Sequence, residues 1–134
     1  MWTHQDSIDT LADPATVWRF FADVPGWQRW NAGIARIEIH GPFAAGTQFF
    51  MEPPGEEGFT STLLTVEENR GFTDETWIGE TRVLVHHRLE PLARGTRITY
   101  ATEITGPEAA SFGPLVTGDF PQVLAALKAL AEAD

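Results

Sequence analysis

The sequence predicts an α+β fold with one strand, two short helices, about six further strands and a long C-terminal helix. Apolar and polar residues alternate in segments between residues 34 and 105, and turn residues separate these segments, which is typical of strands in a sheet with one buried face. Apolar residues instead recur at helical spacing after Asp13 and after Asp119.

The first segment, residues 2–11, is predicted to be a strand of mixed character. Trp2, His4 and Asp6 share one face of such a strand, because side chains alternate between its two faces. A His and an Asp two residues apart suggest metal binding or acid–base chemistry. No third ligand accompanies them, so no metal site is predicted.

Two short helices are predicted to follow this strand. Asp13 is a favourable N-cap, and Pro14 suits the first helical position because its missing N–H costs nothing there. Pro25 and Gly26 end the first helix. The second, shorter helix carries Trp27 and Trp30. The apolar face of the first helix is formed by Val17, Trp18, Phe20, Phe21 and Val24.

The remaining elements are assigned from alternation, turns and caps. A long helix over residues 120–132 is expected after Asp119, which resembles an N-cap with Gln122 at the capping-box position. Residues 108–116 have partly helical character, interrupted by Gly113 and Pro114. The six strands are expected over residues 34–40, 47–52, 59–68, 72–79, 82–90 and 96–105.

Length, charge and composition restrict the function. The 134 residues suit a single domain, residues 1–134, and the formal net charge of -10 argues against nucleic acid and anionic membranes as partners. The chain has no cysteine, no recognisable signal peptide and no apolar run of roughly 20 residues, the length of a membrane span. We therefore expect a cytoplasmic monomer or homodimer without metal or cofactor.

Residues distributed over the whole chain resemble one known superfamily. The opening follows the pattern A-x-P-x-x-V-W-x-x-x-x-D-x-x-x-W-x-x-W, and further motif residues follow in order. The chain thereby resembles START-like proteins, also called SRPBCC or helix-grip proteins, and especially their bacterial polyketide cyclase/dehydrase-like branch. The matching residues are Ala12, Pro14, Val17, Trp18, Asp23, Trp27, Trp30, Gly41, Gly46, Thr47, Phe72, His87, Leu89, Glu90, Pro91, Gly95, Thr96, Thr99, Gly106 and Pro107.

This resemblance implies a curved antiparallel sheet of about seven strands around the C-terminal helix, with an internal cavity between them. It does not fix the function, because one fold hosts both carriers and enzymes. The first hypothesis is binding of a small, largely apolar, aromatic or polyketide-like molecule. The second is a cofactor-independent cyclase, aromatase or dehydratase, and the third is a domain that regulates a partner protein.

His87 and Tyr100 are the leading candidates for chemistry. Each lies on the apolar face of its strand, and pairing of the two strands across residues 91–95 would bring the two side chains together. An inward imidazole suits general acid–base catalysis or a hydrogen bond to a ligand, and a buried tyrosine hydroxyl needs a polar partner. A histidine satisfied by neighbouring groups within the core is the alternative.

Asp74 is a third candidate. If Phe72 faces inward, Asp74 does too, and its carboxylate would orient His87 or accept a proton; if Trp77 faces inward, Asp74 is solvated at the rim. The register is left open here. The residues expected to contact a ligand are Trp27, Trp30, Trp77, Val85, His87, Tyr100, Thr102 and Phe120.

Overall fold

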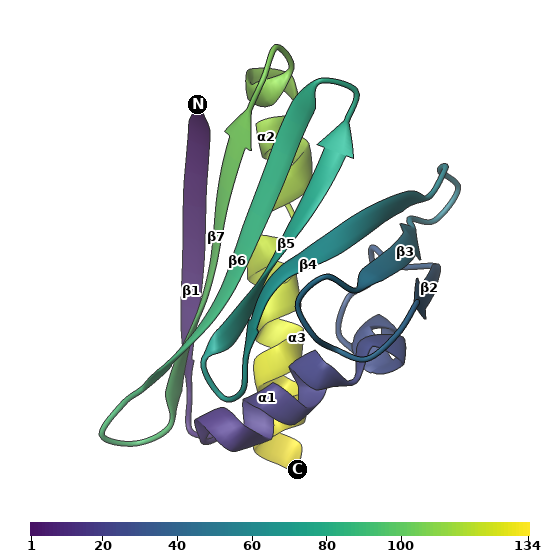
Figure 1. Ribbon diagram of the computed structural model, residues 1–134. Helices are drawn as coiled ribbons and strands as arrows, with labels where there is room; N and C mark the ends of the chain where they lie inside the picture. The colour runs from purple at the N-terminus through teal and green to yellow at the C-terminus, as the bar shows by residue number, and fades with distance from the viewer.

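The computed structural model describes residues 1–134 and has the helix-grip arrangement of a curved seven-stranded antiparallel sheet and a long C-terminal helix (Figure 1). The sheet order is β1-β7-β6-β5-β4-β3-β2, so only β1 is displaced from its place in the sequence. The strands are β1 Trp2–Thr10, β2 Arg36–Ile39, β3 Gln48–Glu52, β4 Phe59–Glu67, β5 Gly71–Ile78, β6 Thr81–Pro91 and β7 Thr96–Thr105. The helices are α1 Pro14–Ala22, the 3₁₀ helix η1 Val24–Arg29, α2 Ala109–Thr117 and α3 Phe120–Ala133.

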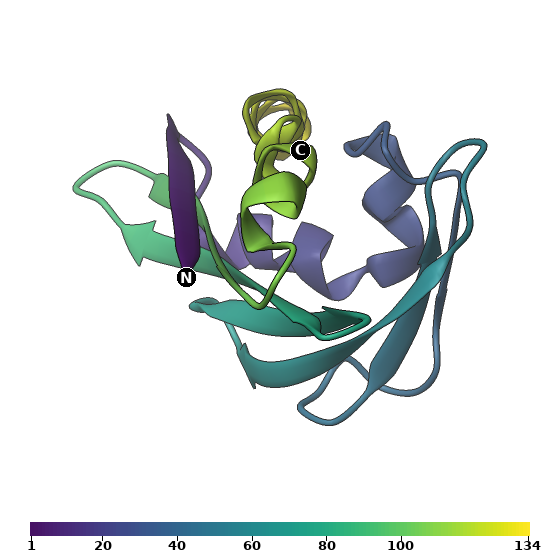
Figure 2. The same ribbon diagram turned by 90° about the horizontal axis from the view of Figure 1, so that it is seen from above.

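The sheet forms a trough, and α2 and α3 lie along its open side (Figure 2). The helix α3 packs on β1 and on α1, while η1 packs on β2 at the other edge of the sheet. The short helices after β1 therefore close one end of the trough. No helix has both the length and the apolar sequence needed to cross a membrane.

The strand register arranges the inner face of the sheet in rows. Because neighbouring strands are antiparallel, a residue on one strand lies directly opposite a partner that faces the same way. Successive strands contribute Ser61, Thr76, Val83 and Ile104 to one row; Leu63, Asp74, Val85 and Thr102 to the next; and Phe72, His87 and Tyr100 to the third. The register left open by the sequence is therefore settled: Phe72, Asp74 and Thr76 face inward.

The core consists of two apolar clusters. The larger one has 19 buried residues and joins α1, η1 and α3 to the sheet. The smaller one consists of Val83, Ile104 and Ala109, where α2 meets β6 and β7. Val85 and Val116 are only partly buried and touch both clusters. The row containing Asp74 thus lies between two apolar regions.

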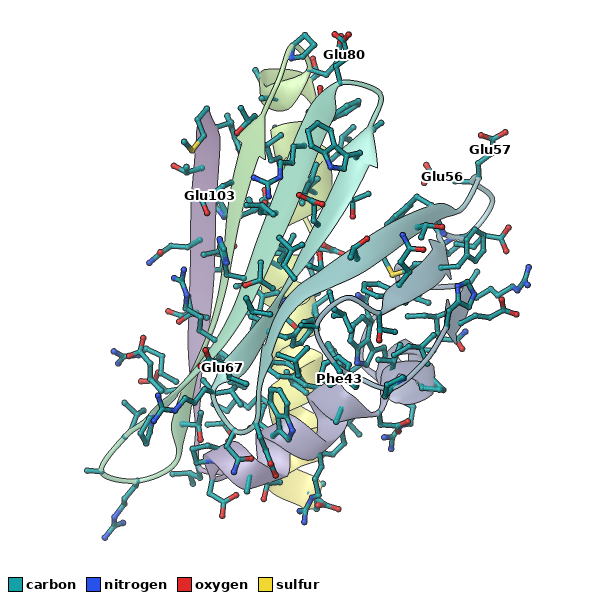
Figure 3. All side chains as sticks on the ribbon, viewed as in Figure 1. Phe43, Glu56, Glu57, Glu67, Glu80 and Glu103 are labelled. Atoms are coloured by element: carbon teal, nitrogen blue, oxygen red, sulfur yellow. The ribbon has the colours of Figure 1, made fainter.

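The apolar side chains of α1 and α3 are buried. Trp18 and Phe21 from α1 have exposed fractions of 9% and 0%, and Leu124 and Leu127 from α3 have 1% and 0%. Phe43, from the loop between β2 and β3, packs against Trp18 with ring centroids 5.7 Å apart (Figure 3). The apolar faces of both helices therefore meet inside the trough.

The N-terminal caps of α1 and α3 differ. The Asp13 carboxylate accepts a hydrogen bond from the Thr16 amide at 2.8 Å, as predicted. The prediction that Asp119 caps α3 through its side chain is wrong, since that residue makes no capping hydrogen bond. Only Gly118 and Asp119 separate α2 from α3, and Asp119 has near-helical backbone angles, whereas a capping residue needs an extended backbone.

Much of the acidic charge lies at turns. Glu56 and Glu57 lie in the turn between β3 and β4, and Glu80 lies in the turn between β5 and β6, all three exposed to solvent (Figure 3). Water screens such charges effectively, so they favour solubility without disturbing the interior.

Candidate functional site

Three ionisable side chains are buried, and they come from three adjacent strands. Asp74 on β5, His87 on β6 and Tyr100 on β7 have exposed fractions of 9%, 9% and 4%. His87 lies directly opposite Tyr100 in the β6–β7 ladder, as expected from the predicted hairpin, and Asp74 lies one row further along. The fold therefore brings the three candidates for chemistry into one place.

Aromatic rings fix the orientation of the His87 imidazole. The ring stacks on Phe72 with centroids 4.0 Å apart and planes 9° apart, and Tyr100 meets its edge at 4.6 Å. The ring of Phe21, from α1, lies at 6.0 Å. Nδ1 lies 3.3 Å from the backbone carbonyl of Phe72, so it is the nitrogen that carries the proton. Nε2 is left as an acceptor, 3.9 Å from the Asp74 carboxylate.

The protonation states of these groups follow from burial. Burial raises the pKa of Asp74 to about 7, and no protein donor hydrogen-bonds to its carboxyl group to oppose that effect. Burial also lowers the pKa of His87 to about 3, so its imidazole is neutral near pH 7. The pKa of Tyr100 is raised by burial and by the nearby carboxyls of Asp74 and Asp119. The group that titrates near neutral pH is Asp74.

The inner face around Asp74 is not completely covered. The side chains of His87 and Asp74 keep 10% and 12% of their surface accessible, and Val85, in the middle of the sheet, is only half-buried. In the adjacent row the hydroxyls of Ser61 and Thr76 bond to each other at 2.6 Å. A polar strip with residual accessible surface therefore separates the two apolar clusters.

The other inward-facing residues expected to contact a ligand have different roles. Trp27 is a core residue: its indole N–H donates to the carbonyl of Phe21 at 3.0 Å, and its ring stacks on Phe72. The hydroxyl of Thr102 donates to the carbonyl of Leu84 at 2.7 Å. Phe120, the first residue of α3, covers the edge of Tyr100, with centroids 5.4 Å apart.

Trp30 differs from Trp27 in one respect. Its exposed fraction is 4%, and its indole N–H is buried without any hydrogen-bond partner. Leaving such a donor unpaired costs about 1–3 kcal/mol, so a ligand that accepts this hydrogen bond would recover the loss. The sequence did not indicate which of the two tryptophans has a free donor.

The prediction that Trp77 contacts a ligand between sheet and helix is wrong. Trp77 is 56% exposed and lies on the outer face of β5, opposite Arg82 of β6. Strand alternation requires this, because Asp74 and Thr76 face inward and their odd-numbered neighbours therefore face outward.

His4 and Asp6 occupy the edge strand β1 on the same face as the buried residues. His4 Nε2 lies 2.8 Å from Asp6 Oδ2, and both side chains remain partly exposed. On the outer face, His86 is held between the hydroxyl of Thr73 at 2.8 Å and the carboxylate of Glu103 at 2.6 Å. His86 thus has side-chain partners for both ring nitrogens, whereas His4 has one for Nε2 alone.

Two hollows on the surface lie away from the buried trio. The larger, of about 610 Å³, adjoins β1, β7 and β6, and contains the ion pair between Arg97 and Asp9. The smaller, of about 250 Å³, lies by α1 and the C-terminus. Neither hollow is lined by Asp74, His87 or Tyr100.

The curved antiparallel sheet, the long C-terminal helix and the polar strip facing it define a helix-grip domain. The sequence model of the family described as "Polyketide cyclase / dehydrase and lipid transport" matches residues 1–132, so the chain belongs to that family. No curated protein matches the chain in sequence.

Solved structures share the fold at low sequence identity. A protein from Mesorhizobium loti has a TM-score of 0.81 and 18% identity, with 98% of each chain covered. The di-domain ARO/CYC protein StfQ from the steffimycin biosynthetic pathway has a TM-score of 0.81 and 14% identity; the match covers 98% of this chain and 50% of StfQ. Norcoclaurine synthase from Thalictrum flavum has a TM-score of 0.78 and 18% identity, with 99% of this chain and 87% of the synthase covered.

Proposed function

We propose that the protein binds a small, largely apolar molecule carrying at least one polar group between the inner face of its sheet and α3. The observation that carries this proposal is that the carboxyl of Asp74 is largely buried, keeps 12% of its side-chain surface accessible on the inner face, and has no hydrogen-bond donor within the protein. Buried polar groups in proteins are nearly always paired, so a carboxyl left alone favours a missing partner.

The surroundings of Asp74 indicate the shape of that partner. Phe72 and Tyr100 lie in the row on one side of Asp74, with Phe120 against Tyr100; Val85 lies opposite Asp74 in its own row, and Val83 lies in the row on the other side. An apolar body would bury surface against these side chains, at about 25 cal/mol for each Å² removed from water. The family description and the steffimycin-pathway neighbour support an aromatic or polyketide-like ligand.

The test begins with native mass spectrometry of the protein purified from its own host. A co-purifying molecule of a few hundred daltons that is lost on denaturation is the expected result. Tryptophan emission then reports on the molecule, because Trp30 is buried in the same apolar cluster as Phe72 and Tyr100 while Trp77 lies on the outer face. The Trp30→Phe variant should lose ligand-induced quenching, and the Trp77→Phe control should keep it. Absence of both a bound molecule and any quenching by an aromatic panel would refute the proposal.

A second candidate function is cofactor-independent acid–base catalysis on the bound molecule, as in a cyclase, aromatase or dehydratase. The observation that favours it is the Asp74 carboxyl, whose pKa of about 7 suits both giving and taking a proton at neutral pH. His87, with its pKa near 3, is a poor base in this setting, so we assign it the role of a hydrogen-bond acceptor beside the reacting group. Tyr100 is suited to donate to a developing oxyanion.

The catalytic hypothesis differs from simple binding in its response to Asp74→Asn. With a substrate of the co-purified class, the variant should lose about 10²–10⁴-fold in rate, the usual effect of removing a general base. The His87→Gln variant, which keeps an acceptor, should lose much less. If both variants convert the substrate within twofold of the wild-type rate, these side chains have no catalytic role.

A further inference from the structure

The interior contains no positively charged side chain. None of the nine arginine and lysine residues is buried. The outer-face Arg82 pairs with Glu75, and Arg97 pairs with Asp9, so both are turned away from the trough. Asp74 therefore lies inside the protein with no cationic side chain beside it, and the neutral imidazole of His87 lies 3.9 Å from its carboxyl.

The hydrogen-bonding groups at the site are mainly acceptors. Asp74 offers two free carboxyl oxygens, and His87 offers Nε2, because its Nδ1 is bonded to the carbonyl of Phe72. The hydroxyl of Tyr100, whose ring lies beside His87, can both donate and accept. A group that donates several hydrogen bonds at once satisfies this set better than a carbonyl or an ether does.

The rings around His87 add to the same preference. Phe21, Phe72 and Tyr100 all lie within 6.0 Å of the His87 ring centroid. The faces of aromatic rings attract cations, and the attraction grows when water is excluded. Phe72 already stacks on His87 and on Trp27, so Phe21 and Tyr100 are the rings left to contribute. Together with the Asp74 carboxylate, and without a competing arginine or lysine, they form an environment for a small organic cation.

We propose that the ligand is a primary or secondary amine with an apolar, aromatic body, and that its ammonium group pairs with Asp74 and donates to Nε2 of His87. This inference rests on the proposed function, since it assigns a chemical class to the ligand of the same site. The apolar body would lie along the strip between the two clusters, against Val85 and Phe120.

The amine hypothesis predicts a direction of proton exchange. An ammonium ion binds the ionised carboxylate, and Asp74, with a pKa of about 7, is about half protonated at pH 7. Binding should therefore release about half a proton at pH 7, and affinity should rise about tenfold from pH 6 to pH 8. The other ionisable groups facing Asp74 are His87, whose pKa burial lowers to about 3, and Tyr100, whose pKa burial raises; burial also raises the pKa of Asp119, which lies beyond Tyr100.

The experiment compares matched probes by isothermal titration calorimetry. 2-Phenylethylamine is paired with 2-phenylethanol, and 2-(1-naphthyl)ethylamine with the corresponding naphthyl alcohol, so that each pair differs only in the charged group. Each is titrated in two buffers with different ionisation enthalpies, into wild type and into Asp74→Asn. Asp9→Asn is the matched control, because it makes the same chemical change at an exposed carboxylate.

We expect at least one amine to bind at least tenfold more tightly than its alcohol and to release protons. Asp74→Asn should weaken the amine about 10- to 100-fold, the usual value of a charged hydrogen bond, while leaving the alcohol within about twofold. Asp9→Asn should change neither. If the alcohols bind as tightly as the amines, or if Asp74→Asn leaves the amine affinity unchanged, the amine hypothesis is wrong. The proposed function, with a neutral ligand, would still stand. If no probe of either kind binds, the amine hypothesis also fails, and the proposed function is then judged by its own mass-spectrometric test.

Discussion

Replacing Asp74 by Asn should change how the stability of the protein depends on pH. Asn has nearly the same shape as Asp but does not ionise, so the variant isolates the cost of charging a buried carboxyl. The pKa of Asp74 rises from 3.8 to about 7 on folding. At about 1.4 kcal/mol for each pKa unit, this corresponds to about 4 kcal/mol of stability lost when the group must ionise.

The direction in which stability changes with pH follows from proton binding. Between pH 4 and pH 7 the unfolded chain has lost the proton from Asp74 while the folded chain still holds it, so folding stability falls as the pH rises through this window. Above pH 7 both states are ionised and the loss is constant. We therefore expect the stability difference, Asp74→Asn minus wild type, to grow by about 4 kcal/mol from pH 4 to pH 8. The buried amide contributes an offset that does not vary with pH.

Urea denaturation in steps of half a pH unit measures that difference, since the free energy of unfolding extrapolates linearly with denaturant. His87 affects wild type and variant alike: its pKa falls from 6.5 to about 3, so it lowers stability as the pH falls through this range. A stability difference that stays flat from pH 4 to pH 8, together with an NMR titration showing His87 protonated at pH 6, would refute the reasoning. Asp74 and His87 would then form a charged pair in the folded state.

Two further predictions concern the core and a turn. Leu127→Ala removes a side chain with an exposed fraction of 0% and should lower the unfolding free energy by about 2–5 kcal/mol; an unchanged urea midpoint would contradict the packing of α3 in the trough. Gly95→Ala should cost about 2–4 kcal/mol, because Gly95 has φ +85° and a Cβ there would collide with the carbonyl oxygen of Thr10. Ala93→Gly, in the same turn, is the control and should cost less than 1 kcal/mol; equal melting temperatures for the two variants would rule out this strain.

The sequence alone determined the order of elements and most of their bounds. Alternation of apolar residues and the turn residues between them identified six strands after the two helices, each within one or two residues of its observed ends. These signals are local: a strand with one buried face needs period-two alternation, and a helix needs an apolar stripe. The cap at Asp13 was predictable for the same reason, since it depends on residues only three positions apart.

The two predictions that were wrong, for Asp119 and Trp77, also have a physical explanation. Asp119 has the residue type of a cap, but the preceding helix α2 holds its backbone near the helical region, and that constraint is not visible within its own turn. Trp77 was expected to face a ligand because it is large and aromatic. Its facing was decided by the inward position of Phe72 and Asp74, which depends on the pairing of β5 with β6.

In the site, too, some features follow from the local sequence and others only from the tertiary structure. His87 and Tyr100 were identified from the sequence because each is a polar ring on an apolar strand face, and a short turn pairs their strands. Only the tertiary structure placed the carboxyl of Asp74 3.9 Å from His87, left it without a donor and raised its pKa to about 7. The burial of Asp74 depends on the side chains of α1 and α3 that cover the sheet. These residues are far from Asp74 in the sequence. For that reason a single sequence predicts which residue types face inward, whereas their charge states are set by the assembled interior.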